Sequence, residues 1–119
     1  MNWYLAKIVF RIICGDGQHT PQFDEQLRLV GASDEDEAFY KAQTIGEQEE
    51  VSFLNIEKKE VQWQFINVSE LYRLTALIDG AELYSRIRET DEAEDYINLV
   101  HRKAQGIQEK QTHKLLHLL

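Results

Sequence analysis

The chain has 119 residues, a net charge of −8 and one cysteine, Cys14. This length suits a single domain with one modest core. One cysteine excludes an intrachain disulfide, so we predict a cytoplasmic protein and not a secreted, disulfide-stapled one. The negative charge disfavours general binding to nucleic acid or to an anionic membrane surface. No apolar run reaches the length that spans a bilayer.

The charge is unevenly distributed along the chain. Residues 101–119 carry four basic residues and one acid, whereas residues 1–100 carry nine basic and twenty acidic residues. The positive charge of the C-terminal segment complements the negative charge of residues 1–100 and can orient the segment on an acidic surface.

Residues 3–14 predict a long strand, because apolar side chains recur at every second position. Gly15-Asp16-Gly17 predicts a turn, and residues 23–31 predict a second strand that completes an antiparallel hairpin. We expect the wholly apolar even-numbered face of the first strand to point into the core. That face consists of Tyr4, Ala6, Ile8, Phe10, Ile12 and Cys14.

Residues 34–47 predict a helix, with Ser33 as the N-cap and an acidic first turn at the positive end of the helix dipole. Gly46 is typical of a C-terminal stop. The apolar stripe of this helix consists of Ala38, Phe39, Ala42 and Ile45. We therefore predict that Ile8, Phe10 and Ile12 of the first strand pack against Ala38, Ala42 and Ile45.

Residues 51–57 and 61–68 predict a second hairpin, joined by Lys58-Lys59. The apolar parity changes between Phe65 and Ile66, which predicts a β-bulge or a twist. Residues 69–78 fit either a helix or an extended continuation of the strand. Asp79-Gly80 predicts a turn, and residues 81–88 predict a fifth strand.

The C-terminal segment predicts a helix capped by Thr90 or Asp91, with a stripe made of Ala93, Tyr96, Ile97, Val100 and Ala104. Gly106 can kink or end this helix, and residues 107–119 then form a further helical piece. We predict an α+β domain over residues 1–88 and a helical extension of the same domain over residues 89–119. The fold class is α+β, with an antiparallel sheet of four to five strands in the order ββαββ(β) packed on one helix.

Four motifs occur in a characteristic order. They are the opening Trp3-Tyr4-Leu5-Ala6-Lys7, the acidic helix start that runs to Ala38, the stretch Trp63-Gln64-Phe65-Ile66-Asn67-Val68, and Glu82-Leu83-Tyr84-Ser85-Arg86. This order resembles the small bacterial proteins of domain-of-unknown-function family 4288 over about residues 3–88. The resemblance implies a fold unit and a bacterial or phage origin. It implies no activity, and it does not extend to residues 89–119.

The sequence carries no recognisable catalytic motif. A nucleophile elbow, a dinucleotide fingerprint and a phosphate-binding loop are all absent, so we assign no catalytic residue and no cofactor. His113 and His117 share a helix face at i, i+4 spacing, but a zinc site needs more ligands than these two imidazoles. We therefore expect no specific metal site.

A polar and aromatic patch is the candidate binding site. It consists of Trp3, Lys7, Trp63, Tyr84 and Arg86, because aromatic residues with arginine are enriched at binding hot spots. The alternative is that the tryptophans fill the core and that the cations are solvated or paired with acids.

The leading functional interpretation is a non-catalytic protein-interaction module, such as an inhibitor, an immunity-like protein or an accessory protein. The alternative is a small-ligand-binding or enzymatic domain with a cleft between sheet and helix. We expect residues 89–119 to contact another chain, most simply a second copy. The competing arrangement folds this segment back onto its own domain. The expected interface residues are Tyr96, Ile97, Val100, Leu115, Leu116 and Leu119.

Overall fold

The computed structural model describes residues 1–118, with side-chain environments described through residue 110. The chain forms two compact units, Met1–Ser85 and Arg86–Leu119. The division lies close to the boundary at residue 88 that the sequence pattern predicts. The assignment of residues 89–119 to the same domain stays a prediction.

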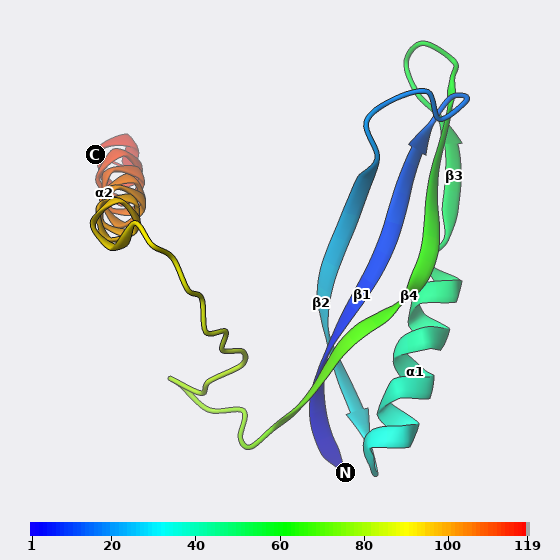
Figure 1. Ribbon diagram of the computed structural model, residues 1–119, viewed down its shortest axis with the longest axis horizontal. Coiled ribbons are helices and arrows are strands. Elements are labelled where there is room, and N and C mark those ends of the chain that lie inside the picture. Colours follow the sequence, from blue (N-terminus) through cyan, green and yellow to red (C-terminus); the bar gives the residue numbers. More distant parts are fainter. Residues whose placement is uncertain (119) are drawn as a thin grey trace. The chain divides into compact units, whose positions relative to one another are not determined.

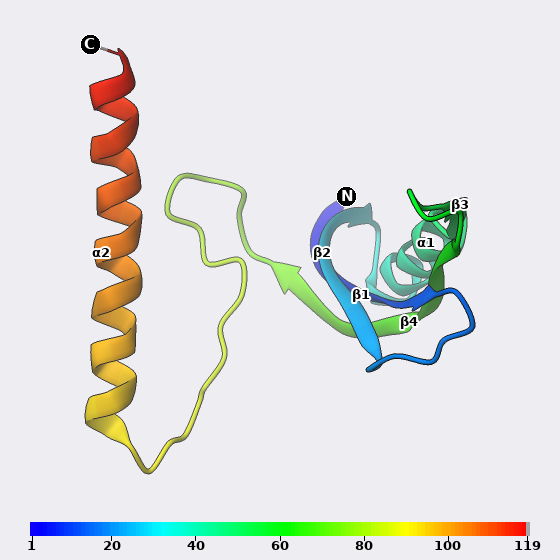
Figure 2. The ribbon, with the colours of Figure 1, turned by 90° about the horizontal axis from the view of Figure 1, so that it is seen from above.

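The first unit contains four strands and one helix, and confirms the predicted α+β class. The sheet has the strand order β2-β1-β4-β3, and every neighbouring pair is antiparallel. The sheet curls around the helix, which lies against one of its faces (Figures 1 and 2). The elements are β1 (Asn2–Cys14), β2 (Gln22–Ala32), α1 (Glu35–Gln48), β3 (Val51–Leu54) and β4 (Glu60–Leu74).

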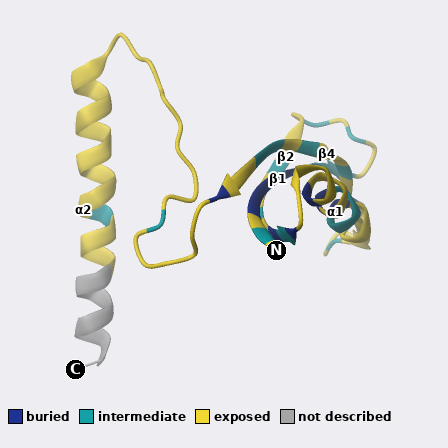
Figure 3. Ribbon diagram, turned by 90° about the horizontal axis from the view of Figure 1, so that it is seen from below, coloured by how far each residue is buried: buried dark blue, intermediate teal, exposed yellow. Residues whose placement is uncertain are grey.

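The core lies between α1 and the even-numbered face of β1, as predicted. Ile8 and Phe10 are 0% and 1% exposed, and they cluster with Ala38 and Ala42 of α1. Buried positions gather along β1 and α1 in the first unit (Figure 3). The prediction that Ile12 is buried with them is wrong, because Ile12 is only half-buried. α1 lies beside the end of the sheet where β1 begins, whereas Ile12 is near the other end of that strand (Figure 1).

The helix face that meets the sheet is made of small residues. Ala38, Ala42 and Gly46 follow one another at four-residue spacing and are all buried, so the helix backbone can approach the sheet closely. Phe39, which the sequence places in the apolar stripe, is instead 39% exposed. Gly46 does not end the helix, because α1 continues to Gln48. Its lack of a side chain makes room for the ring of Phe65.

The N-terminus of α1 is capped reciprocally. The N-cap is Asp34 and not Ser33: the Asp34 Oδ1 atom accepts a hydrogen bond of 2.8 Å from the Glu37 backbone N–H. In return, the Ser33 N–H donates to the Glu37 carboxylate at 3.0 Å. The two bonds satisfy amides near the start of the helix, which lack partners within it.

This cap predicts a pH dependence of stability. Hydrogen bonding by Ser33, helped by the charge of Lys41, holds the pKa of Glu37 below its ordinary value of 4.5. A carboxyl group with a lowered folded-state pKa contributes stability that is fully present above its unfolded pKa and is lost as the pH falls through the folded value. We expect Glu37→Gln to lose less stability than the wild type between about pH 5 and pH 3, measured by urea unfolding at each pH.

Glu35→Gln is the matched control for this measurement. It removes one carboxylate from the same helical turn without touching the Ser33 amide. Its pH dependence should follow that of the wild type. An unchanged pH dependence in Glu37→Gln would contradict the capping role of Glu37.

β4 is longer and less regular than the sequence predicts. The extended interpretation of residues 69–74 is correct, since the strand continues to Leu74. The predicted irregularity is present as two register shifts, between Lys7 and Ile8 and between Val9 and Phe10 of the neighbouring β1. Across from these positions, Ile66 and Ser69 of β4 have no partner in the register.

The predicted fifth strand over residues 81–88 is wrong. The described residues 75–92 contain neither strand nor helix, although a turn does occur at Asp79-Gly80, where the Ala81 N–H donates to the Ile78 carbonyl at 3.0 Å. Alternation of polar and apolar residues indicates which side of an extended segment each side chain lies on. It does not indicate whether a neighbouring strand is present to form backbone hydrogen bonds with that segment. Tyr84 instead packs its ring edge-on against Tyr72.

The second unit contains one helix, α2 (Ala93–Leu118). Thr90 is at the predicted helix start, where its hydroxyl oxygen accepts from the Glu92 N–H at 3.2 Å. The helix continues through Gly106, so the predicted division into two pieces is wrong. A glycine within a helix costs only about 1 kcal/mol relative to alanine. No helix within the described residues combines the length and hydropathy needed to cross a bilayer.

Candidate interaction surfaces

The sheet face turned away from α1, which we call the open face, carries exposed apolar side chains. Alternation places the odd-numbered residues of β1 on this face, opposite the core. Their partners on the neighbouring strands share the face, so Leu27, Leu29 and Tyr72 lie there and are 40–50% exposed. Exposed apolar side chains on one sheet face are typical of a surface that another chain element can cover.

Lys7 lies in the middle of the open face between two carboxylates. Its Nζ atom is 3.3 Å from the Glu25 carboxylate and 3.7 Å from that of Glu70. The hydrogen bond to Glu25 raises the pKa of Lys7. The ammonium group of Lys7 is therefore paired with two carboxylates of its own sheet, and these carboxylates offset its charge.

Three of the five predicted patch residues lie on or beside the open face of the first unit. Trp3 shares the strand and the face of Lys7. Tyr84 returns to the open face after the turn at Gly80, where its ring lies 5.5 Å from that of Tyr72. Burial raises the pKa of Tyr72. Trp3, Lys7 and Tyr84 thus surround a half-covered aromatic surface.

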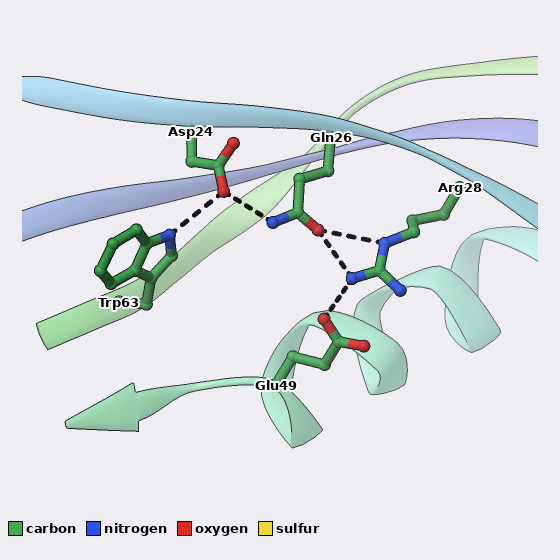
Figure 4. Close-up of polar contacts among 5 residues, drawn as sticks. All are labelled: Asp24, Gln26, Arg28, Glu49 and Trp63. Atoms are coloured by element: carbon green, nitrogen blue, oxygen red, sulfur yellow. Dashed lines mark hydrogen bonds and ion pairs between the residues drawn. The ribbon is translucent and has the colours of Figure 1, made fainter. Parts of the chain in front are cut away.

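Trp63 lies on the opposite face of the sheet, in a polar network (Figure 4). Its indole N–H donates to the Asp24 carboxylate at 3.1 Å, and the Gln26 amide donates to the same oxygen at 2.6 Å. The Gln26 carbonyl oxygen accepts from the Arg28 guanidinium, which also pairs with Glu49 after the end of α1. The network joins β4, β2 and the C-terminus of α1 beyond the buried core.

The network accounts for Trp63 as a structural residue. Its ring stacks on Phe53 at 6.0 Å and packs against the core. The strand pattern contains this information, because Val61, Trp63 and Phe65 alternate on one face with glutamines on the other. The predicted patch is therefore divided: Trp63 lies on the α1 side of the sheet, and Arg86 belongs to the second unit.

A groove of about 830 Å³ lies between the β1–β2 loop and the β3–β4 loop, lined by Cys14, Asp16, His19 and Lys59 among others. The imidazole of His19 is engaged at both nitrogens. Its Nε2 accepts from the Cys14 N–H at 3.0 Å, and its Nδ1 lies 2.9 Å from the Thr20 carbonyl oxygen. His19 therefore orders the loop and cannot act as a base without giving up one of these bonds.

The described residues include no group of three His, Cys, Asp or Glu side chains that could hold a metal ion. The side chains of His113 and His117, where the sequence argues against a metal site, lie outside the described residues.

The contact between α1 and the sheet is closely packed along the row of small residues on the helix. Ala38 and Ala42 are fully buried against the sheet. A Cβ atom at Gly46 would already collide with the ring of Phe65. Packing of this closeness is typical of a structural core and not of a binding cavity.

The second unit carries an apolar surface along one side of α2, which we call the α2 stripe. It consists of Tyr96, Ile97, Leu99, Val100, Ala104 and Ile107, and its large residues are 37–64% exposed. The Arg88 guanidinium lies 5.3 Å from the centre of the Tyr96 ring, a cation–π contact at one end of the stripe. A groove of about 360 Å³ follows these side chains to Ile107.

Part of the expected interface is placed on this stripe, and part is not described. Tyr96, Ile97 and Val100 are exposed on α2. Leu115, Leu116 and Leu119 lie outside the residues whose side chains the structure describes. Leu99 and Ile107 also lie on the α2 stripe, although the sequence pattern does not place them among the expected interface residues. Ile107 was missed because Gly106 suggested a break in the helix, although the spacing from Val100 through Ala104 to Ile107 fits one continuous apolar face.

The comparisons with known proteins concern the first unit. A family model described as Domain of unknown function (DUF4288) matches residues 3–85, nearly the whole of the unit Met1–Ser85. No curated protein and no solved structure matches the chain. The family match confirms the resemblance that the four sequence motifs indicate, and the chain belongs to the DUF4288 family.

Proposed function

We propose that this chain is a non-catalytic protein-interaction module and that the α2 stripe is its docking surface. One observation carries the proposal: α2 is the sole helix or strand of the described second unit. Helices in proteins gain most of their stability by packing an amphipathic face on another element. The α2 stripe therefore needs a surface that its own unit does not supply.

The core of the first unit supports this assignment. Every buried apolar side chain among the described residues lies between Tyr4 and Leu74. The core described for the first unit therefore contains no residue of α2.

Burial of the stripe would supply most of the binding energy. Covering a large aliphatic side chain such as Ile97, Val100 or Ile107 contributes roughly 1.5–3 kcal/mol. A surface ion pair contributes only about 0–1 kcal/mol. The stripe should therefore determine affinity, and the charges around it should determine orientation.

Site-specific photo-crosslinking in cells of the native host tests the proposal. A photoreactive phenylalanine derivative replaces Ile107, which lies on the stripe, or Gln105, which 3.6-residue periodicity places on the other side of the helix. We expect irradiation to join the Ile107 variant to a second polypeptide. The Gln105 variant should give much less adduct, because its side chain points away from the bound partner.

Three outcomes would contradict the proposal. They are the absence of any adduct, equal adducts from both positions, and an Ile107 crosslink confined to residues 1–85 of the same chain. The last outcome would establish the competing arrangement, in which the helix folds back onto its own domain.

A further inference from the structure

The charges of the second unit are segregated along α2. The start of α2 and the two residues before it are strongly acidic, since residues 91–95 contain four acids and no base: Asp91, Glu92, Glu94 and Asp95. Basic residues follow at Arg102, Lys103 and Lys110, with Glu109 as the one acid between residues 101 and 110. The N-terminal end of the helix is therefore acidic, and the part that follows it up to residue 110 is net basic.

The α2 stripe has the spacing of a two-stranded helical seam. Ile97, Val100, Ala104 and Ile107 follow one another at intervals of three, four and three residues. This is the heptad pattern that lets two helices interlock side by side. Lys103 lies at the edge of the stripe, where a long side chain can cover apolar surface and still place its ammonium group in water.

We propose that the partner of α2 is the α2 helix of a second copy, in antiparallel orientation. This inference rests on the proposed function and names the partner of that same stripe. A parallel pair would bring the two acidic first turns together and would repel there. An antiparallel pair separates the two acidic starts and places each of them beside the C-terminal half of the other helix, where Lys110 lies.

The residue pattern also fixes a register for this pair. A two-fold axis level with residue 102 places Ile97 opposite Ile107 of the second copy and Val100 opposite Ala104 of the second copy. Large aliphatic residues then meet at both ends of the seam, and a smaller pair closes its centre. In this register Lys110 of the second copy lies at the level of Glu94, and the two acidic starts lie at opposite ends of the pair.

Sedimentation equilibrium of the full chain tests whether a second copy binds at the stripe. We expect a reversible dimer at micromolar concentration. Val100→Asp should raise its dissociation constant about 100-fold or more, because pairing would bury two unpaired carboxylates. Asn98→Asp makes the same change of charge on the opposite side of the helix and should leave the constant within about twofold of the wild type.

Disulfide trapping tests the orientation. In a full-length Cys14→Ser background, Val100→Cys and Ala104→Cys variants are mixed in equal amounts in a glutathione redox buffer. An antiparallel pair predicts that the mixed disulfide exceeds the one half expected from random pairing. A parallel pair predicts that the two symmetric disulfides predominate, which would overturn the antiparallel assignment.

The outcomes separate this inference from the proposed function. A monomeric full chain, together with an Ile107 adduct to a different polypeptide, would overturn the second copy as partner and leave the proposed function standing. A dimer that is unaffected by Val100→Asp would overturn the inference, because it would form through another surface. A monomeric chain that gives no intermolecular adduct at Ile107 would overturn both.

Discussion

Replacing Phe10 with alanine should lower the free energy of unfolding by about 3–5 kcal/mol, the usual cost of removing a buried phenylalanine. Phe10 is 1% exposed, and its ring centre lies 6.0 Å from that of Phe65. The truncation would remove the largest fully buried side chain of the described residues, with that of Ile8 next in size. It would leave a cavity between two rigid elements, since α1 already touches the sheet through Ala38 and Ala42.

Phe23→Ala is the matched control for this measurement. Phe23 lies on the open face and is 55% exposed, so its truncation should cost less than about 1 kcal/mol. Denaturant titration of both variants gives the comparison. A loss below about 1 kcal/mol for Phe10→Ala, or equal losses for the two variants, would contradict the placement of the core on the even-numbered face of β1.

The sequence predicts the core of this fold well because strand patterning is a direct physical signal. Side chains alternate between the two faces of a strand, so the wholly apolar even-numbered face of β1 indicates its partner surface. The change of apolar parity after Phe65 likewise predicts an irregularity, which the structure places across from Ile8 and Phe10. These features depend only on neighbouring residues.

The features that the sequence mispredicts depend on distant ones. Gly46 looks like a helix stop, but its role is to accommodate Phe65, which lies on another strand. The alternation over residues 81–88 resembles a strand, but no strand neighbour pairs with this segment. Local pattern cannot reveal close approach or the presence of a pairing partner, because both are set by tertiary structure.

The candidate binding patch likewise combines residues whose placement follows from local pattern with residues whose placement depends on distant contacts. Trp3 and Lys7 lie on one strand at even spacing, so their common face is predictable. Trp63 follows a strand pattern that places it with Val61 and Phe65, towards the core. Its bond to Asp24 joins residues 39 positions apart, and nothing in the local sequence indicates that contact.

Replacing Gly46 with alanine should destabilise the first unit, although alanine is the better helix former. The substitution gains about 1 kcal/mol of helix propensity. Against this, the new Cβ would overlap the ring of Phe65, and inserting carbon into a packed core costs about 1–3 kcal/mol. Phe65 is also held by the ring of Phe10 and cannot simply move aside. We expect a net loss of about 1–2 kcal/mol by denaturant titration.

Two further substitutions make this prediction specific. Gly106→Ala introduces the same methyl group into α2, where nothing lies within 4 Å of the new Cβ. It should therefore raise the helicity measured by circular dichroism. Phe65→Leu shortens the side chain that Gly46→Ala would strike, so the cost of Gly46→Ala should be smaller in that background. If Gly46→Ala instead stabilises the chain, α1 does not lie against the sheet as closely as its row of small residues indicates.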